Sequence, residues 1–319
     1  MRWHALAGFL LALLILVPAA EARRGPCIPG IERPACHVRT AKVLNVADGD
    51  TVHVRLRQNG RWSERRSVRL TGVQAMELRR YSRARGRRGA CHAVAAAERL
   101  ERLLKGPNNK RRRIRLASRR PNSVGRGRRG RLRHAIAFRQ GGRWHDAGAV
   151  LIREGHGLWD PNRREWAWNR RYSKLAQLAA RAGRRIWNTA ACRRGPRQSS
   201  PLTLKVKWDA RGSDGRHPNG EWIKIRNHDP VHAVGLRGWW VRDSALRRYT
   251  FPRGAVIQPR RAIRVRIGPG RNRPKTFHWG LPDPIFENRK RRRGIGDGGY
   301  LFDRHGDLRA WRMYPCRIC

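Results

Sequence analysis

Residues 41–57 read AKVLNVADGDTVHVRLR, and this stretch decides the fold of the N-terminal half. Apolar and polar residues alternate over 41–46 and again over 51–57, which is the period of a half-buried β-strand. The pair Asp48-Gly49 separates the two runs, and this dipeptide favours a tight turn between antiparallel strands. The stretch therefore predicts a β-hairpin whose turn carries two acidic residues, Asp48 and Asp50.

The residues that follow continue this β pattern and then change to a helical one. Asn59-Gly60 marks a second turn and 67–73 a third strand, so three strands form a meander. Apolar residues then recur every three or four positions over 89–104, which predicts a helix. Such strands followed by interleaved helices predict a small α+β barrel. Its further strands are expected at 111–116 and 133–139, and its further helices at 146–154 and 168–182.

The C-terminal part of the chain has a different composition. Residues 193–201 contain Gly, Pro and paired Ser and are typical of a linker. Beyond them, short β-rich runs separated by Gly, Pro, Asn and Asp predict a β-sandwich. These runs are 202–208, 221–226, 236–242, 262–267 and 299–303. We therefore expect a signal peptide at 1–22, a lead at 23–40, a first domain at 41–192 and a second at 202–319.

The composition indicates a folded protein with an acidic partner. The 319 residues include 65 Arg and 9 Lys against 22 Asp and Glu, which leaves a formal charge of +52. Apolar residues make up 39% of the chain and include 13 Trp, so the chain can form hydrophobic cores, unlike a disordered polycation. A chain of this length usually divides into two domains. We expect the partner to be a polyanion.

The first 22 residues have the features of a secretory signal peptide. Arg2 precedes an apolar run at 9–17, and Ala20-Glu21-Ala22 fits a small-x-small cleavage site. The run is short for a membrane span, and no second apolar stretch follows it in the sequence. We therefore expect a secreted, soluble protein without a membrane anchor.

Six cysteines remain after this segment, and an even number favours three disulfides in an oxidising compartment. Sequence alone permits many pairings. Closeness along the chain favours two pairs and leaves a third: Cys27 with Cys36, Cys316 with Cys319, and Cys91 with Cys192. A redox or metal role for the last two cysteines is an alternative, but one pair supplies only half of a four-ligand zinc site.

Further motifs follow the hairpin turn in order. Residues 68–77 read VRLTGVQAME, residues 130–132 read GRL, and Ile186-Trp187 closes the last helical stretch. Together with the turn, these motifs resemble the staphylococcal nuclease (thermonuclease) family over roughly residues 41–187. The resemblance implies an OB-type five-stranded barrel with helices. It also implies hydrolysis of phosphodiester bonds that leaves 3′-phosphates.

The resemblance gives each matching residue a role. Asp50 would be the carboxylate ligand of a calcium ion, with Asp48 beside it. Arg69 and Arg131 would clamp the phosphate, and Glu77 would position or deprotonate the attacking water. The chemistry needs these residue types, because a hard cation and two guanidinium groups neutralise charge that builds up on the phosphoryl oxygens. A carboxylate must also lie within hydrogen-bond reach of the water.

The chain departs from the family pattern at the second metal ligand. Gln74 stands where the family usually has an Asp, and Ala75 would supply its backbone carbonyl. The Gln74 amide offers an oxygen but no negative charge, so we expect an active enzyme with a weaker calcium site. Met76 replaces the usual Pro, which loosens the turn without changing the chemistry.

A Gly- and Arg-rich segment precedes Arg131. Arg126, Arg128 and Arg129 lie in this segment, and we expect them to bind phosphate electrostatically. The alternative is a basic loop with no binding role. By composition alone, Arg69 and Arg131 are equally ordinary members of a set of 65 arginines, and only their motif positions distinguish them.

The second half carries four motifs in order: NGEWI at 219–223, LRGWWVRD at 236–243, YTFPRG at 249–254 and GYLFDRHG at 299–306. They resemble the lamin tail domain over roughly 202–314. This domain is an immunoglobulin-like β-sandwich that occurs in nuclear lamins and beside some secreted bacterial nucleases. The sequence there has no cluster of acid, base and nucleophile, so we expect a binding or scaffolding module.

These observations predict a secreted, calcium-dependent endonuclease that cuts DNA, with RNA as a further candidate substrate. A basic lamin-tail module would hold it on the polyanion. One alternative is a non-catalytic extracellular nucleic-acid binder or scaffold on a degenerate nuclease fold. Another is a cationic protein that adheres to anionic cell-surface polymers. No His-Glu-x-x-His or Walker-type motif in the sequence supports a different nuclease chemistry.

Overall fold

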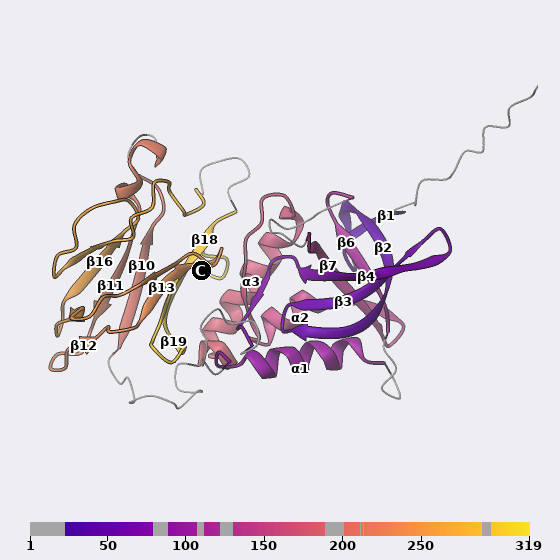
Figure 1. The fold of residues 1–319 in the computed structure, drawn as a ribbon, viewed down its shortest axis with the longest axis horizontal. Helices are drawn as coiled ribbons and strands as arrows, with labels where there is room; N and C mark the ends of the chain where they lie inside the picture. The colour runs from indigo at the N-terminus through magenta and orange to yellow at the C-terminus, as the bar shows by residue number, and fades with distance from the viewer. Residues whose placement is uncertain are drawn as a thin grey trace, which may run out of the picture.

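The computed structural model describes residues 23–78, 89–106, 112–121, 130–188, 201–210, 212, 214–288 and 295–319. The chain is mostly β-structure with a few helices, and its two halves lie side by side (Figure 1). Three sequence predictions fall outside the described residues: the signal peptide at 1–22, the phosphate-binding segment with Arg126, Arg128 and Arg129, and nearly all of the linker at 193–201.

Strands of the N-terminal half form a seven-stranded sheet. They are β1 (Arg23–Ile28), β2 (Ile31–Asp48), β3 (Thr51–Gln58), β4 (Arg61–Leu70), β6 (Arg113–Ser118), β7 (Leu132–Gln140) and β8 (Arg143–Asp146). Hydrogen-bonded neighbours run in the order β1-β2-β3-β4-β7-β6, and β6 pairs again with β2. The strands β2, β3, β4, β7 and β6 thus form a closed ring, as the strands of a barrel do.

The predicted hairpin forms the first part of this ring. β2 and β3 pair antiparallel from Ala41 opposite Leu56 to Asp48 opposite Thr51, so the turn lies at the Asp-Gly pair. Residues 23–40, expected only to precede the domain, also enter the sheet as β1 and the start of β2. Residues 37–42 of β2 pair with β6. β2 is therefore long enough to pair with two strands in succession, which closes the ring.

The α-helices of the described residues are α1 (Ala93–Leu104), α2 (Ala147–Arg153) and α3 (Asn169–Arg181). They lie close to the positions that the apolar periods predict. α1 buries side chains three or four residues apart, namely Ala93, Ala96, Leu100, Leu103 and Leu104. Two short strands, β5 (Val73–Ala75) and β9 (Gly157–Trp159), pair antiparallel beside α2. This pairing places the chain after β4 next to the chain after β9.

The C-terminal half is a two-sheet β-sandwich. Its strands are β10 (Leu202–Lys207), β11 (Trp222–Asn227), β12 (Val234–Gly235), β13 (Trp240–Asp243), β14 (Arg248–Thr250), β15 (Val256–Ile257), β16 (Ala262–Arg266), β17 (Thr276–His278), β18 (Asp297–Phe302) and β19 (Leu308–Tyr314). One sheet has the order β10-β11-β16-β17 and the other β14-β13-β18-β19, and β12 pairs with β15. The strand expected at 236–242 begins only at Trp240, because the chain turns at Gly238, whose φ is 75°.

The two halves share a hydrophobic core. Trp187, in the 3-10 helix Arg185–Trp187, contacts the rings of Tyr300 and Trp311, with centroid separations of 6.3 and 5.2 Å. Gln177 of α3 adds polar contacts: its Nε2 donates to the Pro315 carbonyl at 2.9 Å, and its Oε1 accepts the Arg317 N–H at 2.7 Å. The halves are therefore packed against each other.

Two of the three predicted disulfides are confirmed. Cys27 is bonded to Cys36, and Cys316 to Cys319. Cys91 is also disulfide-bonded, but Cys192, its predicted partner, lies outside the described residues.

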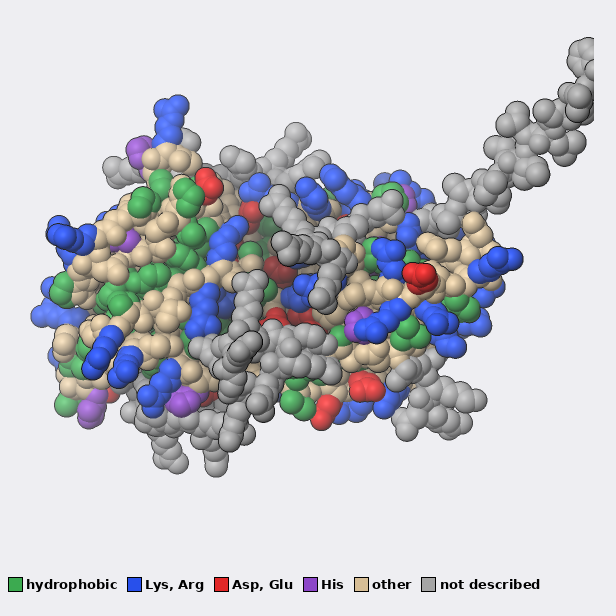
Figure 2. All heavy atoms as spheres, viewed as in Figure 1, with side chains coloured by type: hydrophobic (Ala, Val, Ile, Leu, Met, Phe, Trp, Pro, Cys, Tyr) green, Lys and Arg blue, Asp and Glu red, His purple; other side chains and the backbone are tan. Residues whose placement is uncertain are grey.

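The surface reflects the large positive charge. Lys and Arg side chains are spread over both halves of the face in Figure 2, whereas Asp and Glu side chains are few. Within the described residues, no helix is long and apolar enough to cross a membrane.

Candidate active site

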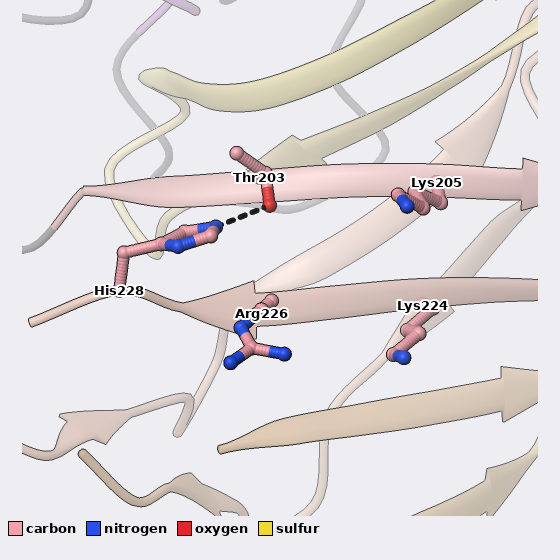
Figure 3. A pocket seen from close by; sticks show the side chains of 5 residues that line it. All are labelled: Thr203, Lys205, Lys224, Arg226 and His228. Atoms are coloured by element: carbon pink, nitrogen blue, oxygen red, sulfur yellow. Dashed lines mark hydrogen bonds between the residues drawn. The ribbon is translucent and has the colours of Figure 1, made fainter. Parts of the chain in front are cut away.

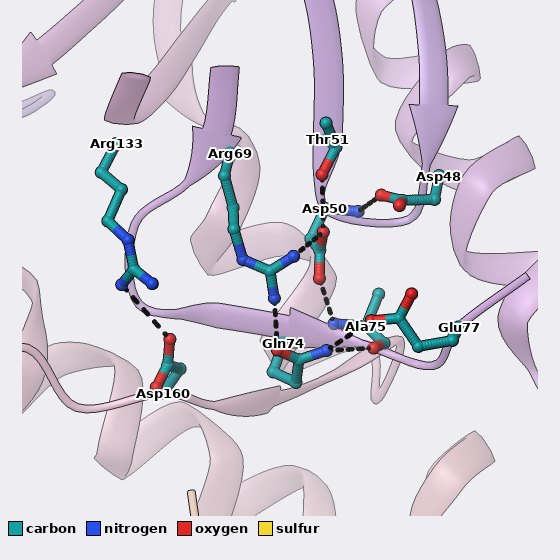
Figure 4. A network of polar contacts seen from close by, with 9 residues as sticks. All are labelled: Asp48, Asp50, Thr51, Arg69, Gln74, Ala75, Glu77, Arg133 and Asp160. Atoms are coloured by element: carbon teal, nitrogen blue, oxygen red, sulfur yellow. Dashed lines mark hydrogen bonds and ion pairs between the residues drawn. The ribbon is translucent and has the colours of Figure 1, made fainter. Parts of the chain in front are cut away.

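Most of the predicted site residues come together where the ring meets β5 (Figure 4). Asp50 lies in the turn between β2 and β3, Arg69 lies near the end of β4, and Gln74 belongs to β5. Thr51 pairs with Arg69 across β3 and β4, and the Leu70 N–H donates to the Asp50 carbonyl at 2.8 Å. The strand pairing therefore sets the positions of these side chains relative to one another.

Asp50 is buried and is held by donors from three segments. Its Oδ1 accepts from the Thr51 hydroxyl at 3.0 Å and from Arg69 Nη1 at 2.9 Å. Its Oδ2 accepts the Ala75 N–H at 2.8 Å. Asp48 lies beside it, as predicted, and its Oδ1 accepts the Asp50 N–H at 3.1 Å. The hairpin turn, β4 and β5 thus all fix this carboxylate.

Gln74 connects Arg69 to the end of β5. Its Oε1 accepts a hydrogen bond from Arg69 Nη2. Its Nε2 donates to the Ala75 carbonyl at 2.8 Å and makes a longer contact of 3.4 Å with Glu77 Oε1. The Arg69 guanidinium therefore bridges Asp50 and Gln74, and Glu77 lies half-buried at the other end of the network.

Negative charge is concentrated in this network. Burial, together with the charge of Asp50, raises the pKa of Asp48 to about 7. Burial and Asp50 also raise the pKa of Glu77, against the opposing charges of Arg69 and Arg131. For Arg69, burial acts to lower the pKa, but Asp50 and other carboxylates offset this and raise it. A cation placed among these carboxylates would relieve their repulsion.

Arg131 is the remaining residue predicted to clamp phosphate. It is exposed immediately before β7, whose Leu132 pairs with Val68, next to Arg69. Its charge lowers the pKa of Glu77, so it lies within electrostatic range of that carboxylate. The structure therefore places both predicted arginines within electrostatic range of Glu77.

The structure adds an ion pair that sequence reasoning missed. Arg133 lies opposite Arg69 in the pairing of β7 with β4, and its Nη1 is 3.9 Å from Asp160 Oδ2. Asp160 follows β9, and its N–H donates to the Gly72 carbonyl at 3.0 Å. Burial raises the pKa of Asp160 to about 6, against the charges of Arg133 and Arg69. No motif marked Asp160, because only the pairing of β5 with β9 brings it here.

The C-terminal half contributes a cation at the border of this site. Arg242 of β13 interacts electrostatically with Asp160 and with Arg69. Burial lowers the pKa of Arg242, although Asp243 and Asp160 oppose this. Within the described part of the chain, its Nη2 is buried without a hydrogen-bond partner. Arg242 belongs to the lamin-tail motif at 236–243, but nothing in that motif indicated a place beside this site.

The residues expected to bind calcium fit that ion by donor type. Asp50, Gln74 and the Ala75 carbonyl supply only oxygens, which a hard cation prefers. Each of these groups already accepts a hydrogen bond within the chain, and Arg69 donates two of those bonds. Across the described ranges, no group of three or more His, Cys, Asp or Glu side chains is placed to hold a metal. Because Arg69 donates to both Asp50 and Gln74, it is the group with which a metal ion would compete.

A comparison with known protein families finds a match in the C-terminal half. Residues 205–315 match the family model of the Lamin Tail Domain. These residues form a lamin tail domain. The two-sheet sandwich of β10–β19 agrees with the immunoglobulin-like fold expected for it. No nuclease family is detected in the chain, and no curated protein matches it.

Proposed function

We propose that the protein is a secreted, calcium-dependent endonuclease that hydrolyses DNA, with the lamin tail domain as a basic binding module. The observation that carries the proposal is the network of Asp50, Arg69, Gln74 and Glu77, which joins the hairpin turn to the motif at 68–77. Each of these residue types is common by itself. Their joint arrangement in one network is much less common by chance.

The ring of strands supports an OB-type barrel in the N-terminal half. When the five strands are numbered in chain order, the first three, β2, β3 and β4, are neighbours in the ring. The fifth, β7, lies between the third, β4, and the fourth, β6. An OB-type barrel is a five-stranded Greek-key barrel, and such barrels bind oligonucleotides. We assign the N-terminal half to a staphylococcal nuclease-like domain on this arrangement together with the motifs.

Each side chain has a task in phosphodiester hydrolysis. Glu77 accepts the proton of the attacking water, so hydrolysis should slow as the pH falls below the raised pKa of Glu77. Arg69 and Arg131 stabilise the charge that builds up on the phosphoryl oxygens. The water oxygen bonds to phosphorus and the bond between phosphorus and the 5′ oxygen breaks. The 5′ oxygen leaves as a hydroxyl after it takes a proton from solvent, and the phosphate stays on the 3′ oxygen.

A calcium ion would be held by Asp50, the Gln74 amide oxygen and the Ala75 carbonyl, and it would neutralise phosphoryl charge. Arg69, whose guanidinium binds Asp50 Oδ1 and Gln74 Oε1, would compete with calcium for these oxygens. A released Arg69 is free to bind the phosphate. The oxygens of Asp50 and Gln74 would then serve calcium in place of the Arg69 guanidinium.

A DNA hydrolysis assay on the mature chain, across a calcium titration and with a chelator, tests the proposal. We expect cleavage that depends on calcium and falls by about a hundredfold or more in Glu77→Gln. The matched control is Glu64→Gln, which changes an exposed acid on β4 and should leave the rate unchanged. No cleavage by the unaltered chain at any calcium concentration would instead support a non-catalytic nucleic-acid binder, which the loss of one carboxylate at Gln74 favours.

A further inference from the structure

One sheet of the lamin tail domain presents a row of cations to the solvent. Burial alternates along β10, β11 and β16, so that every second side chain points away from the core. We call this side the outer face; its basic residues are Lys205, Lys207, Lys224, Arg226, Arg264 and Arg266. The sequences of the three strands contain no Asp or Glu to balance them.

The strand register places three of these cations directly beside one another. Lys205 lies opposite Lys224 in the pairing of β10 with β11, and Lys224 lies opposite Arg264 in the pairing of β11 with β16. Neighbouring strands are about 4.8 Å apart. Like charges directly opposite each other on a sheet are destabilising. The row therefore weakens the fold, and features that oppose folding are expected at functional sites.

The outer face also has a hollow and a stacking surface. The hollow, of about 290 Å³, is lined by Thr203, Lys205, Lys224, Arg226 and His228 (Figure 3). Its volume lies at the lower end of the range for small-molecule pockets. His228 Nε2 lies 2.8 Å from the Thr203 hydroxyl at its end. Beside it, the Arg264 guanidinium lies 5.3 Å from the ring centroid of Trp222.

We propose that the outer face binds a nucleic-acid strand, with the row Lys205, Lys224 and Arg264 on successive phosphates. The planar groups of Trp222 and Arg264 provide a surface on which the bases of a nucleic acid stack, in addition to the charge contacts that the row makes with phosphate. The choice of nucleic acid as ligand rests on the proposed function, whereas the binding of a polyanion rests on the face alone. The lamin tail domain then holds substrate at a second place, separate from the site around Asp50.

The test compares two triple variants of the full chain with the same change in charge. The first is Lys205→Glu, Lys224→Glu and Arg264→Glu. The control is Arg237→Glu, Arg253→Glu and Arg304→Glu, which alters exposed arginines outside β10, β11 and β16. Binding to a labelled single-stranded oligonucleotide is measured in chelator at several salt concentrations, so that hydrolysis plays no part. Thermal unfolding checks that both variants fold.

We expect the first variant to lose affinity by between about tenfold and a hundredfold near physiological salt. The slope of log affinity against log salt should fall by about 2, since three phosphate contacts each contribute about 0.7 on a single strand. The control should keep the slope. If the triple variant does not fold, the single variant Lys224→Gln should lower the slope by about 0.7.

Two results would overturn the proposal. In the first, both triple variants weaken binding equally, so that only net charge matters. In the second, the outer-face variant loses binding to heparin but keeps binding to the oligonucleotide, so that the face serves a polysaccharide. Neither result depends on catalysis. A chain that binds through the outer face but cleaves no DNA would contradict the proposed hydrolysis and leave this inference intact.

Discussion

Arg69 is the residue on which the proposed site depends most. Its guanidinium bonds at once to Asp50 and Gln74, and all three side chains are buried. Hydrogen bonds to charged groups contribute about 1.5–3 kcal/mol each. Asp50 and Gln74 are also the side chains expected to bind calcium. On the proposed function, Arg69 and calcium would therefore compete for the same oxygens.

Removing the Arg69 guanidinium should strengthen calcium binding while abolishing catalysis. In Arg69→Ala, the oxygens of Asp50 and Gln74 lose their internal donor, and we expect calcium affinity to rise roughly tenfold or more. The rise of the melting temperature with calcium concentration measures this affinity without any substrate. Arg131→Ala, which removes an exposed arginine, should leave it nearly unchanged. An Arg69→Ala chain that binds calcium no better than the original would contradict the competition.

Asp160 should make stability depend on pH. Burial raises its pKa in the folded chain to about 6, and the negative charge of Asp243 adds to this rise. The positive charges of Arg133, Arg69 and Arg242 oppose it. Because the folded state holds this proton more tightly than the unfolded state, Asp160 lowers stability as the pH rises from about 4 to 6. The loss is about 2–3 kcal/mol, and it persists above that range.

The variant Asp160→Asn removes this titration. We expect the free energy of unfolding to fall less between pH 4 and pH 7 in Asp160→Asn than in the original chain, as measured by denaturant unfolding at each pH. Asp283→Asn, at an exposed position, serves as the control. Parallel pH curves for the original chain and Asp160→Asn would rule out the role given to this carboxyl group.

At the scale of elements, Gly49 in the hairpin turn is required for two separate reasons, the turn itself and the packing around it. The Asp-Gly pair predicted the turn on grounds of backbone freedom. In the structure, however, a Cβ added at Gly49 would lie 2.6 Å from the Cβ atoms of Ala75 and Ala96. β5 and α1 thus approach the turn too closely for any side chain. The glycine is needed for packing that carries Asp50 into the site.

The outer face gives a prediction about the stability of its sheet. Lys224→Glu places an acid between Lys205 and Arg264, so two repulsive cross-strand pairs become attractive. At low salt, where surface charges are least screened, we expect the free energy of unfolding to rise by about 1 kcal/mol. The melting temperature should then rise by a few degrees. A decrease in the free energy of unfolding would show that the cations do not repel one another in the folded sheet.

At the scale of the whole molecule, the shared core couples the two halves. Trp187 of the N-terminal half lies against Tyr300 and Trp311 of the lamin tail domain, and Gln177 bonds to the chain after β19. Packed interfaces of this kind favour cooperative unfolding, whereas a flexible tether would let each half unfold alone. The same packing holds Arg242 at the border of the candidate site.

We expect the unaltered chain to unfold in a single calorimetric transition and Trp311→Ala to separate it into two. The substitution removes an aromatic contact between the halves that contributes about 1 kcal/mol beyond its buried area. Trp208→Ala is the matched control, because Trp208 stacks on Tyr314 within the lamin tail domain at a centroid distance of 4.3 Å. It should destabilise that domain without increasing the number of transitions. One transition in Trp311→Ala and two in Trp208→Ala would contradict the coupling.

A feature of the fold could be predicted from the sequence when the interacting residues are close along the chain. The hairpin, α1 and the Cys27–Cys36 bond involve neighbours in the chain, and local patterns indicated all three. The pairing of β5 with β9 joins segments more than eighty residues apart, and no local pattern marked it. Asp160 was missed for that reason.

The sequence by itself determined the two-part organisation, the lamin tail domain and the positions of the candidate motifs, because these depend on residue order and on periods of two and 3.6 residues. Only the tertiary structure decided that Arg69 occupies the oxygens expected for calcium and that Arg242 borders the site from the other half. It also decided that three cations stand in register on one face. These features arise when strand pairing and packing bring distant residues within a few ångströms, where burial and charge set their behaviour.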